Sequence, residues 1–147
     1  MKCFFTIGHS NHSIDKFFQL LNQHGVTMLA DARTYPASRH HPHFNGRALH
    51  EQLEVKGITY YYCGTHLGGK RTPHPANYEA ALDHLEALAE QHCIALLCAE
   101  EDPGHCHRGT LLTPSLLGRG HQVLHIRGTG ELQHSKVEPV LEQLTLF

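Results

Sequence analysis

The apolar residues of the chain alternate between short continuous runs and longer stretches with helical spacing. The continuous runs predict strands over residues 3–7, 26–30, 58–62, 93–98 and 121–126. Between them, apolar residues recur every three or four positions, as Phe17, Phe18 and Leu21 do, which predicts amphipathic helices. Apolar strands that alternate with helices are typical of a parallel sheet covered on both faces. The pattern therefore predicts a single-domain, three-layer α/β/α fold with a mostly parallel sheet of about five strands.

Capping residues set the expected helix ends. Ser13, Asn45 and Asn77 precede three of the helical stretches and are predicted N-caps. Pro114 removes a backbone hydrogen bond, so we expect a short or kinked helix there. We place an α/β domain at residues 1–130 and a C-terminal helix or tail at 131–147, after the glycines at 128 and 130.

Composition and charge narrow the class of protein. The chain has 147 residues, of which 40% are hydrophobic and 18% charged, as expected for one ordinary soluble domain. We expect a cytoplasmic protein, because the sequence has no membrane-spanning run and no signal peptide. The net charge of −2 argues against a basic surface that holds DNA by counterion release.

The five cysteines are odd in number and include no C-x-x-C pair, so we expect reduced thiols. Cys3 and Cys93 stand at the starts of predicted strands. That position puts them at the edge opposite the carboxyl ends, where we expect inert core thiols.

Polar side chains gather just past the carboxyl ends of the strands, where open α/β sheets bind ligands. The residues at these positions are His9, Ser10, Asn11, Asp31, Arg33, Cys63, Cys98 and Glu100. We expect one pocket at this edge, surrounded by His9, Asp31, Arg33, Arg39, Cys98, Glu100, Cys106, His107 and Arg108.

Several segments resemble the DUF-488 family of small, mostly bacterial proteins. They are Thr6-Ile7-Gly8-His9-Ser10, Asp31-Ala32-Arg33, Pro36-x-Ser38-Arg39, Phe44-Asn45, Leu67-Gly68-Gly69, Leu97-Cys98-Ala99-Glu100 and Pro103-x-x-Cys106-His107-Arg108. The similarity covers nearly the whole chain in order. It implies a fold and a shared site, but it carries no established reaction.

Positively charged side chains near these segments could bind phosphate oxygens. We assign substrate binding to Ser10, Asn11, Arg33, Arg39, Lys70, Arg71 and Arg108. Arg108 opens a helix, whose free N–H groups favour an anion. For Arg33 the alternative is an ion pair with Asp31, and for Arg39 a role as a loop anchor.

The loop from Cys98 to Arg108 is dense in reactive groups. Its three carboxylates would raise the pKa of a thiol, which makes Cys98 a poor phosphatase nucleophile. In one interpretation Glu100 or Asp31 is a general base or nucleophile, and His9 or His107 is its proton partner. The candidate catalytic residues are then His9, Asp31, Cys98, Glu100 and His107.

Two other interpretations of this loop remain open. In one, Cys98, Cys106 and His107 bind a transition metal, joined by Cys63 or His9, although C-x7-C-H is not a recognised zinc spacing. In the other, the polar groups pair among themselves and hold the loop. No cofactor is required by the sequence.

The last five residues resemble the Q-L-x-L-F peptide by which many bacterial replication and repair proteins bind the DNA sliding clamp. Gln143 would offer its amide, and Leu144, Leu146 and Phe147 would fill an apolar groove. The alternative is a terminal helix from about Val137 that packs on the body.

Taken together, the residues and the resemblance predict an enzyme of DNA metabolism. It would act on a phosphate-bearing substrate, DNA or a nucleotide, by a hydrolytic or base-removing reaction, and it would be tethered to the clamp. One alternative is a non-catalytic clamp-bound adaptor or a sensor of nucleotide or metal. Another is a nucleotide-metabolism enzyme without a link to DNA.

Overall fold

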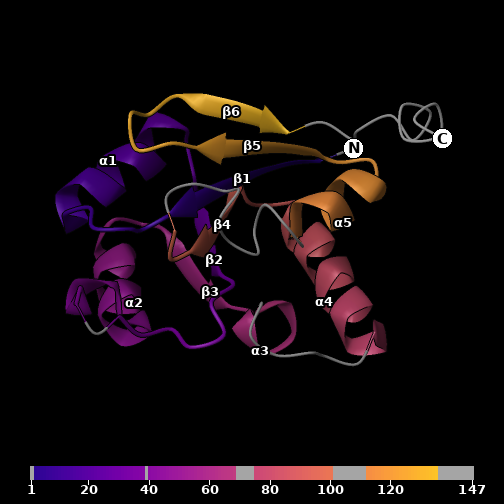
Figure 1. Cartoon of the computed structure of the whole chain (residues 1–147), viewed down its shortest axis with the longest axis horizontal. Helices are drawn as coiled ribbons and strands as arrows, with labels where there is room; N and C mark the ends of the chain where they lie inside the picture. The colour runs from indigo at the N-terminus through magenta and orange to yellow at the C-terminus, as the bar shows by residue number, and fades with distance from the viewer. Residues whose placement is uncertain (1, 39, 69–74, 101–111, 136–147) are drawn as a thin grey trace, which may run out of the picture.

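A computed structural model describes residues 2–38, 40–68, 75–100 and 112–135 of the chain (Figure 1). Within this part the strands form one sheet in the order β3-β2-β4-β1-β5-β6. Their bounds are β1 Cys3–Gly8, β2 Met28–Asp31, β3 Thr59–Tyr62, β4 Ile94–Cys98, β5 Gln122–Ile126 and β6 Leu132–Ser135. Neighbouring strands are parallel except β5 and β6, which are antiparallel. The predicted, mostly parallel sheet is confirmed, with six strands instead of about five.

Helices cover both faces of the sheet. They are α1 Ile14–Gln23, α2 Gly46–Val55, α3 Gly64–Leu67, α4 Pro75–Leu88, α5 Thr113–Gly118 and the 3-10 turn η1 Pro42–Phe44. Leu21 of α1 and Leu49 of α2 lie in one apolar core with Leu29 of the sheet. Leu82 of α4 and Leu116 of α5 lie in a second core on the other face. The three-layer α/β/α architecture is therefore confirmed (Figure 1).

The helix starts agree with the sequence in part. The Ser13 hydroxyl caps α1 and accepts from the Lys16 N–H at 3.1 Å, as predicted. Asn45 stands at the N-cap of α2, but its Oδ1 accepts from the Ser38 N–H at 2.6 Å and so ties down the preceding loop. The prediction for Asn77 was wrong, because α4 already begins at Pro75. Proline suits a first helical turn, where its missing N–H costs little.

Strand β6 lies beyond the predicted domain boundary at residue 130. A turn carries the chain back from β5, and Gly130 has a φ of 89° that favours glycine. The Gly130 carbonyl accepts from His24 Nε2 at 2.9 Å and from Gln23 Nε2 at 3.4 Å. The end of α1 thus holds the turn in place, and the chain after residue 130 continues the sheet.

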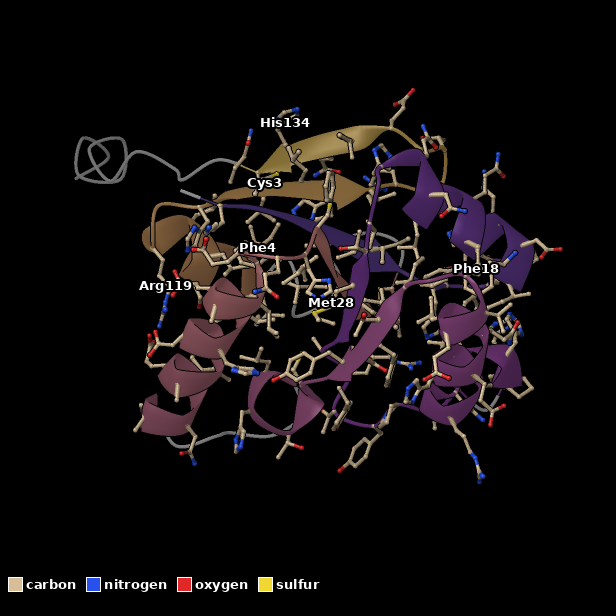
Figure 2. All side chains as sticks on the ribbon, turned by 180° about the vertical axis from the view of Figure 1, so that it is seen from behind. Cys3, Phe4, Phe18, Met28, Arg119 and His134 are labelled. Atoms are coloured by element: carbon tan, nitrogen blue, oxygen red, sulfur yellow. The ribbon has the colours of Figure 1, made fainter. Side chains whose placement is uncertain are left out.

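The edge where the parallel strands begin carries a cluster of charged residues. Arg119, at the end of α5, donates to Glu79 and Asp83 of α4 at 2.5 Å and 2.7 Å, and also to Glu86 (Figure 2). His121 contacts Glu86 as well. These ion pairs join α4 to the start of β5, far from the carboxyl ends.

Among the described residues, none of the helices is both long and apolar enough to cross a membrane.

Candidate functional site at the carboxyl edge

Asp31 and Arg33 form a buried ion pair where β2 ends. Arg33 Nε donates to Asp31 Oδ1 at 2.9 Å, and Nη2 donates to Oδ2 at 2.7 Å. The Arg33 backbone N–H also donates to Oδ1, at 3.1 Å. The side chains are 5% and 0% exposed, so salt screens this pair weakly. The ion pair that the sequence offered as the alternative role of Arg33 is therefore present.

Tyr60 of β3 completes the environment of this carboxylate. Its hydroxyl donates to Asp31 Oδ2 at 2.6 Å. Burial, followed by the charge of Asp31, raises the pKa of the phenol, so the hydroxyl stays protonated and donates. With Tyr60 and the three Arg33 donors, Asp31 accepts four hydrogen bonds. Such a satisfied carboxylate is suited to holding Arg33, while its role as a base or nucleophile stays a prediction.

One donor of Arg33 is left over. Within the described residues, Nη1 is buried and has no hydrogen-bond partner. A buried N–H without a partner costs about 1–3 kcal/mol, and native proteins rarely leave one. Asp31 engages Nε and Nη2, so Nη1 is the guanidinium nitrogen left with an unused donor.

His9 lies in the same site as a neutral base. It follows β1, is 4% exposed, and stacks on Phe44 with the ring centroids 4.6 Å apart. Its Nδ1 donates to the Ser10 carbonyl at 3.0 Å, which leaves the lone pair on Nε2. Burial lowers the pKa of His9 to about 4, and the positive charge of Arg33 also lowers it. Near pH 7 the ring is therefore neutral, and its Nε2 can accept a hydrogen bond.

Phe44 fixes the orientation of this ring. It is fully buried at the end of η1, and His43 packs on it with a centroid distance of 4.2 Å. Phe17 of α1 meets Phe44 edge-on at 5.0 Å. His9 is thus held between the helical layer and the sheet.

Close backbone packing fixes the loop that carries Arg33. A Cβ placed on Gly64 would lie 1.8 Å from the Arg33 carbonyl oxygen, and one on Gly68 would lie 2.2 Å from Thr34 Oγ1. Tyr62 adds a hydrogen bond from its hydroxyl to the Thr34 carbonyl at 2.6 Å. Helix α3 can approach this loop because its first residue, Gly64, and its C-cap, Gly68, lack side chains.

Ser10 stores backbone strain beside His9. Its φ of 45° lies in the left-handed region, which costs a residue with a side chain about 1–2 kcal/mol. The Ser10 N–H donates to the Ala99 carbonyl at 2.8 Å, so the segment after β4 holds the strained turn. Strain of this kind often occurs at functional sites.

The other predicted residues are distributed unevenly. Asn11 and Glu100 are exposed and Ser10 is half-buried. Cys98 is buried and disulfide-bonded, so it is not the reduced thiol that the sequence predicts. Cys63 is a free cysteine beside Asp31, and burial raises the pKa of its thiol, which makes it a weak nucleophile. The predicted residues Arg39, Lys70, Arg71, Cys106, His107 and Arg108 lie outside the described residues.

The prediction of core thiols was wrong for one cysteine. Cys3 is exposed at the start of β1 (Figure 2), while Cys93 is half-buried. Both lie at the edge opposite the candidate site, as predicted.

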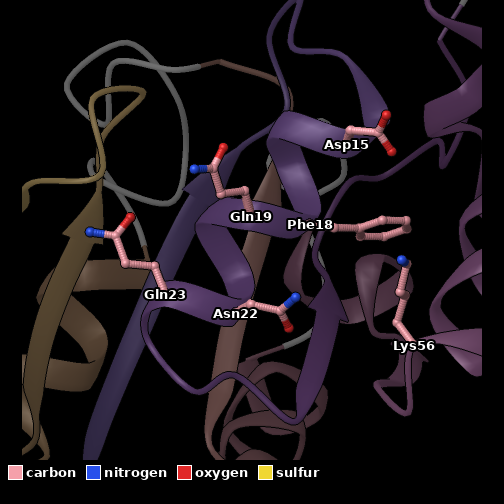
Figure 3. Close-up of a pocket in the computed structure, with 6 residues that line it drawn as sticks. All are labelled: Asp15, Phe18, Gln19, Asn22, Gln23 and Lys56. Atoms are coloured by element: carbon pink, nitrogen blue, oxygen red, sulfur yellow. The ribbon is translucent and has the colours of Figure 1, made fainter.

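A shallow cavity of about 550 Å³ lies along α1, away from the candidate site (Figure 3). Its lining residues are Asp15, Phe18, Gln19, Asn22, Gln23 and Lys56. Lys56 lies over the Phe18 ring, with Nζ 5.6 Å from its centroid. The cavity includes none of the predicted site residues, so we assign it no role in the chemistry.

Comparison with models of protein families identifies the family of the chain. The model of the domain of unknown function DUF488 matches residues 13–76 and 71–113, more than half of the sequence. The chain belongs to this family. Searches among curated proteins and among solved structures found no match.

Proposed function

We propose that this member of the DUF488 family acts on a phosphate-bearing substrate, DNA or a nucleotide, at the carboxyl edge of its sheet. The observation that supports the proposal is the unpaired, buried Nη1 of Arg33. A phosphate oxygen would satisfy this donor and would gain a charge-assisted hydrogen bond in a site shielded from water.

His9 gives this site its chemistry. A neutral imidazole with its lone pair on Nε2 can accept a hydrogen bond from a water or from a substrate hydroxyl and orient it. Because its pKa is lowered to about 4, the ring is a weak base, and its part in the proposed hydrolytic or base-removing reaction is to position the attacking oxygen. Asp31 and Tyr60 hold Arg33 in position and need not touch the substrate.

The proposal includes a tether to the sliding clamp through Gln143, Leu144, Leu146 and Phe147, which lie outside the described residues. Its support is the sequence motif together with the net charge of −2, which leaves little nonspecific attraction to DNA. A bound tether raises the local concentration of the enzyme at DNA without a basic surface.

The anion site is tested by titrating the protein with inorganic phosphate, nucleoside monophosphates and short DNAs. Arg33→Lys should lower the affinity at least about tenfold, because a lysine cannot both pair with Asp31 and present a second planar donor. Arg47→Ala is the matched control, since the Arg47 side chain is 94% exposed on α2. Unchanged affinity in a folded Arg33→Lys protein would contradict the anion site.

Turnover and clamp binding separate the remaining interpretations. Cleavage of a nucleotide or DNA that is lost in His9→Gln supports the enzyme, whereas binding without turnover supports the adaptor or sensor. A chain that ends at Glu142 should lose clamp affinity and keep its thermal melting curve. Equal clamp affinity of both chains would refute the tether and favour the nucleotide-metabolism enzyme.

A further inference from the structure

Two free cysteines lie side by side at the edge where the parallel strands begin. Phe5 of β1 is paired with Ala95 of β4, so two residues earlier on each strand Cys3 stands beside Cys93. Side chains two positions apart on a strand share a face, so Cys3 points to the same side as Phe5. Phe5 and Cys93 both pack against the core beneath α1 and α2. The two thiols therefore project from neighbouring strands on one face.

Cys3 is exposed and Cys93 is half-buried, so the pair is open to solvent from one side.

The spacing of the strands suits an ion between the two sulfur atoms. Neighbouring strands lie about 4.8 Å apart, and in-register side chains on one face keep about this separation. A metal–thiolate bond is about 2.3 Å for zinc, so two bonds in line span about 4.6 Å. A disulfide would need the Cβ atoms at about 3.5–4.5 Å, closer than parallel strands place them. The geometry thus favours a bridging ion over a disulfide.

The number of ligands narrows the choice of ion. Zinc requires four ligands in a structural site, and no cluster of three or more His, Cys, Asp or Glu is found among the residues that the structure describes. The nearby His24 carbonyl lies 3.9 Å from Cys93 Sγ, and the His24 Nε2 is engaged with the Gly130 carbonyl. Soft thiolate ligands suit Cu(I), zinc and iron–sulfur clusters, and of these Cu(I) is the one that two thiolates in line can hold without further ligands.

We propose that Cys3 and Cys93 form a two-thiolate binding site for a soft monovalent metal ion, Cu(I). Binding forms two metal–sulfur bonds, and the two thiol protons pass to solvent, so the bound unit carries one negative charge. The step is not a redox reaction. The site lies at the opposite edge from Arg33 and does not depend on the proposed function.

The test uses the full chain and Cu(I) alone, kept reduced by exclusion of oxygen and buffered with a competing chelator. Native mass spectrometry counts the bound ions, and the competition gives the affinity. Cys3→Ser and Cys93→Ser should each remove one bound ion and weaken the affinity for Cu(I) at least about 100-fold. The reason is that a single remaining thiolate lacks the affinity that a second, linked metal–sulfur bond adds. Cys63→Ser is the control, since Cys63 is free but 7% exposed in the other core.

Two results would overturn the proposal. One is Cu(I) uptake in either serine variant at wild-type affinity, which would show that the two sulfur atoms do not act together. The other is an equal loss in Cys63→Ser. Thermal melts of all three variants are recorded, and a Cys93→Ala variant repeats the test if the serine at this half-buried position unfolds the protein.

Discussion

Acidification should destabilise the protein through His9. The unfolded chain takes up a proton on this ring near pH 6.5, whereas in the folded protein the pKa is lowered to about 4. Between these values the unfolded state binds more protons, so stability is present at neutral pH and is lost as the pH falls. A difference of about 2.5 pKa units corresponds to about 3 kcal/mol at its limit, and to about 2 kcal/mol at pH 5.

The measurement is urea unfolding of the wild type and of His9→Gln at pH 7 and pH 5. The glutamine does not titrate, and all other groups are common to both proteins, so the comparison isolates His9. The free energy of unfolding of the wild type should fall by about 2 kcal/mol more than that of the variant. An equal fall in both proteins would mean that His9 titrates normally, and the buried neutral base would be refuted.

Further substitutions test the packing and charges on which the site rests. Gly64→Ala should lower the free energy of unfolding by about 2 kcal/mol or more, since the new Cβ meets the Arg33 backbone. Gly118→Ala, which meets no atom within 4 Å, should not, and similar melts for the two variants would contradict this packing. Tyr60→Phe should cost about 1–3 kcal/mol in urea unfolding by leaving Asp31 short of one donor, and no loss would show that this bond is dispensable. Glu86 has its pKa lowered below 4.5, first by His121, so it stabilises the fold above pH 4.5 and loses this effect as the pH falls further. Glu86→Gln should flatten the acid limb of a plot of stability against pH, and an unchanged limb would exclude this ion pair as its cause.

Position along the strands predicted the candidate site better than side-chain chemistry did. Asp31 and Arg33 were placed at the carboxyl edge because they follow an apolar strand, and both lie there. Which donors meet the carboxylate could not be predicted, because Tyr60 comes from a different strand and reaches Asp31 across the sheet. A half-buried tyrosine needs a partner for its hydroxyl, but the sequence does not identify that partner.

Other errors share a physical origin in tertiary context. Strand β6 is four residues long, and its sequence mixes polar and apolar residues without a clear period. It forms because the turn at Gly130 is held by Gln23 and His24, which are more than 100 residues earlier in the chain. The close packing of α3 against the Arg33 loop is also nonlocal. Gly64 and Gly68 indicate in the sequence that the backbone is closely approached, but the sequence does not identify the residues that approach it. The local pattern of apolar residues determines which helices and strands form, whereas these nonlocal contacts determine how β6 and the Arg33 loop are held against the rest of the fold.

The charge distribution leads to a last prediction, on the salt dependence of DNA binding. Each phosphate contact contributes about −0.9 to the slope of log affinity against log salt for duplex DNA. The cations predicted for the site are Arg33, Arg39, Lys70, Arg71 and Arg108, so the slope should be no steeper than about −4.5. Fluorescence anisotropy at a series of salt concentrations measures it. A steeper slope would mean that cations elsewhere hold the DNA, and the protein would then have no need of a clamp tether to stay there.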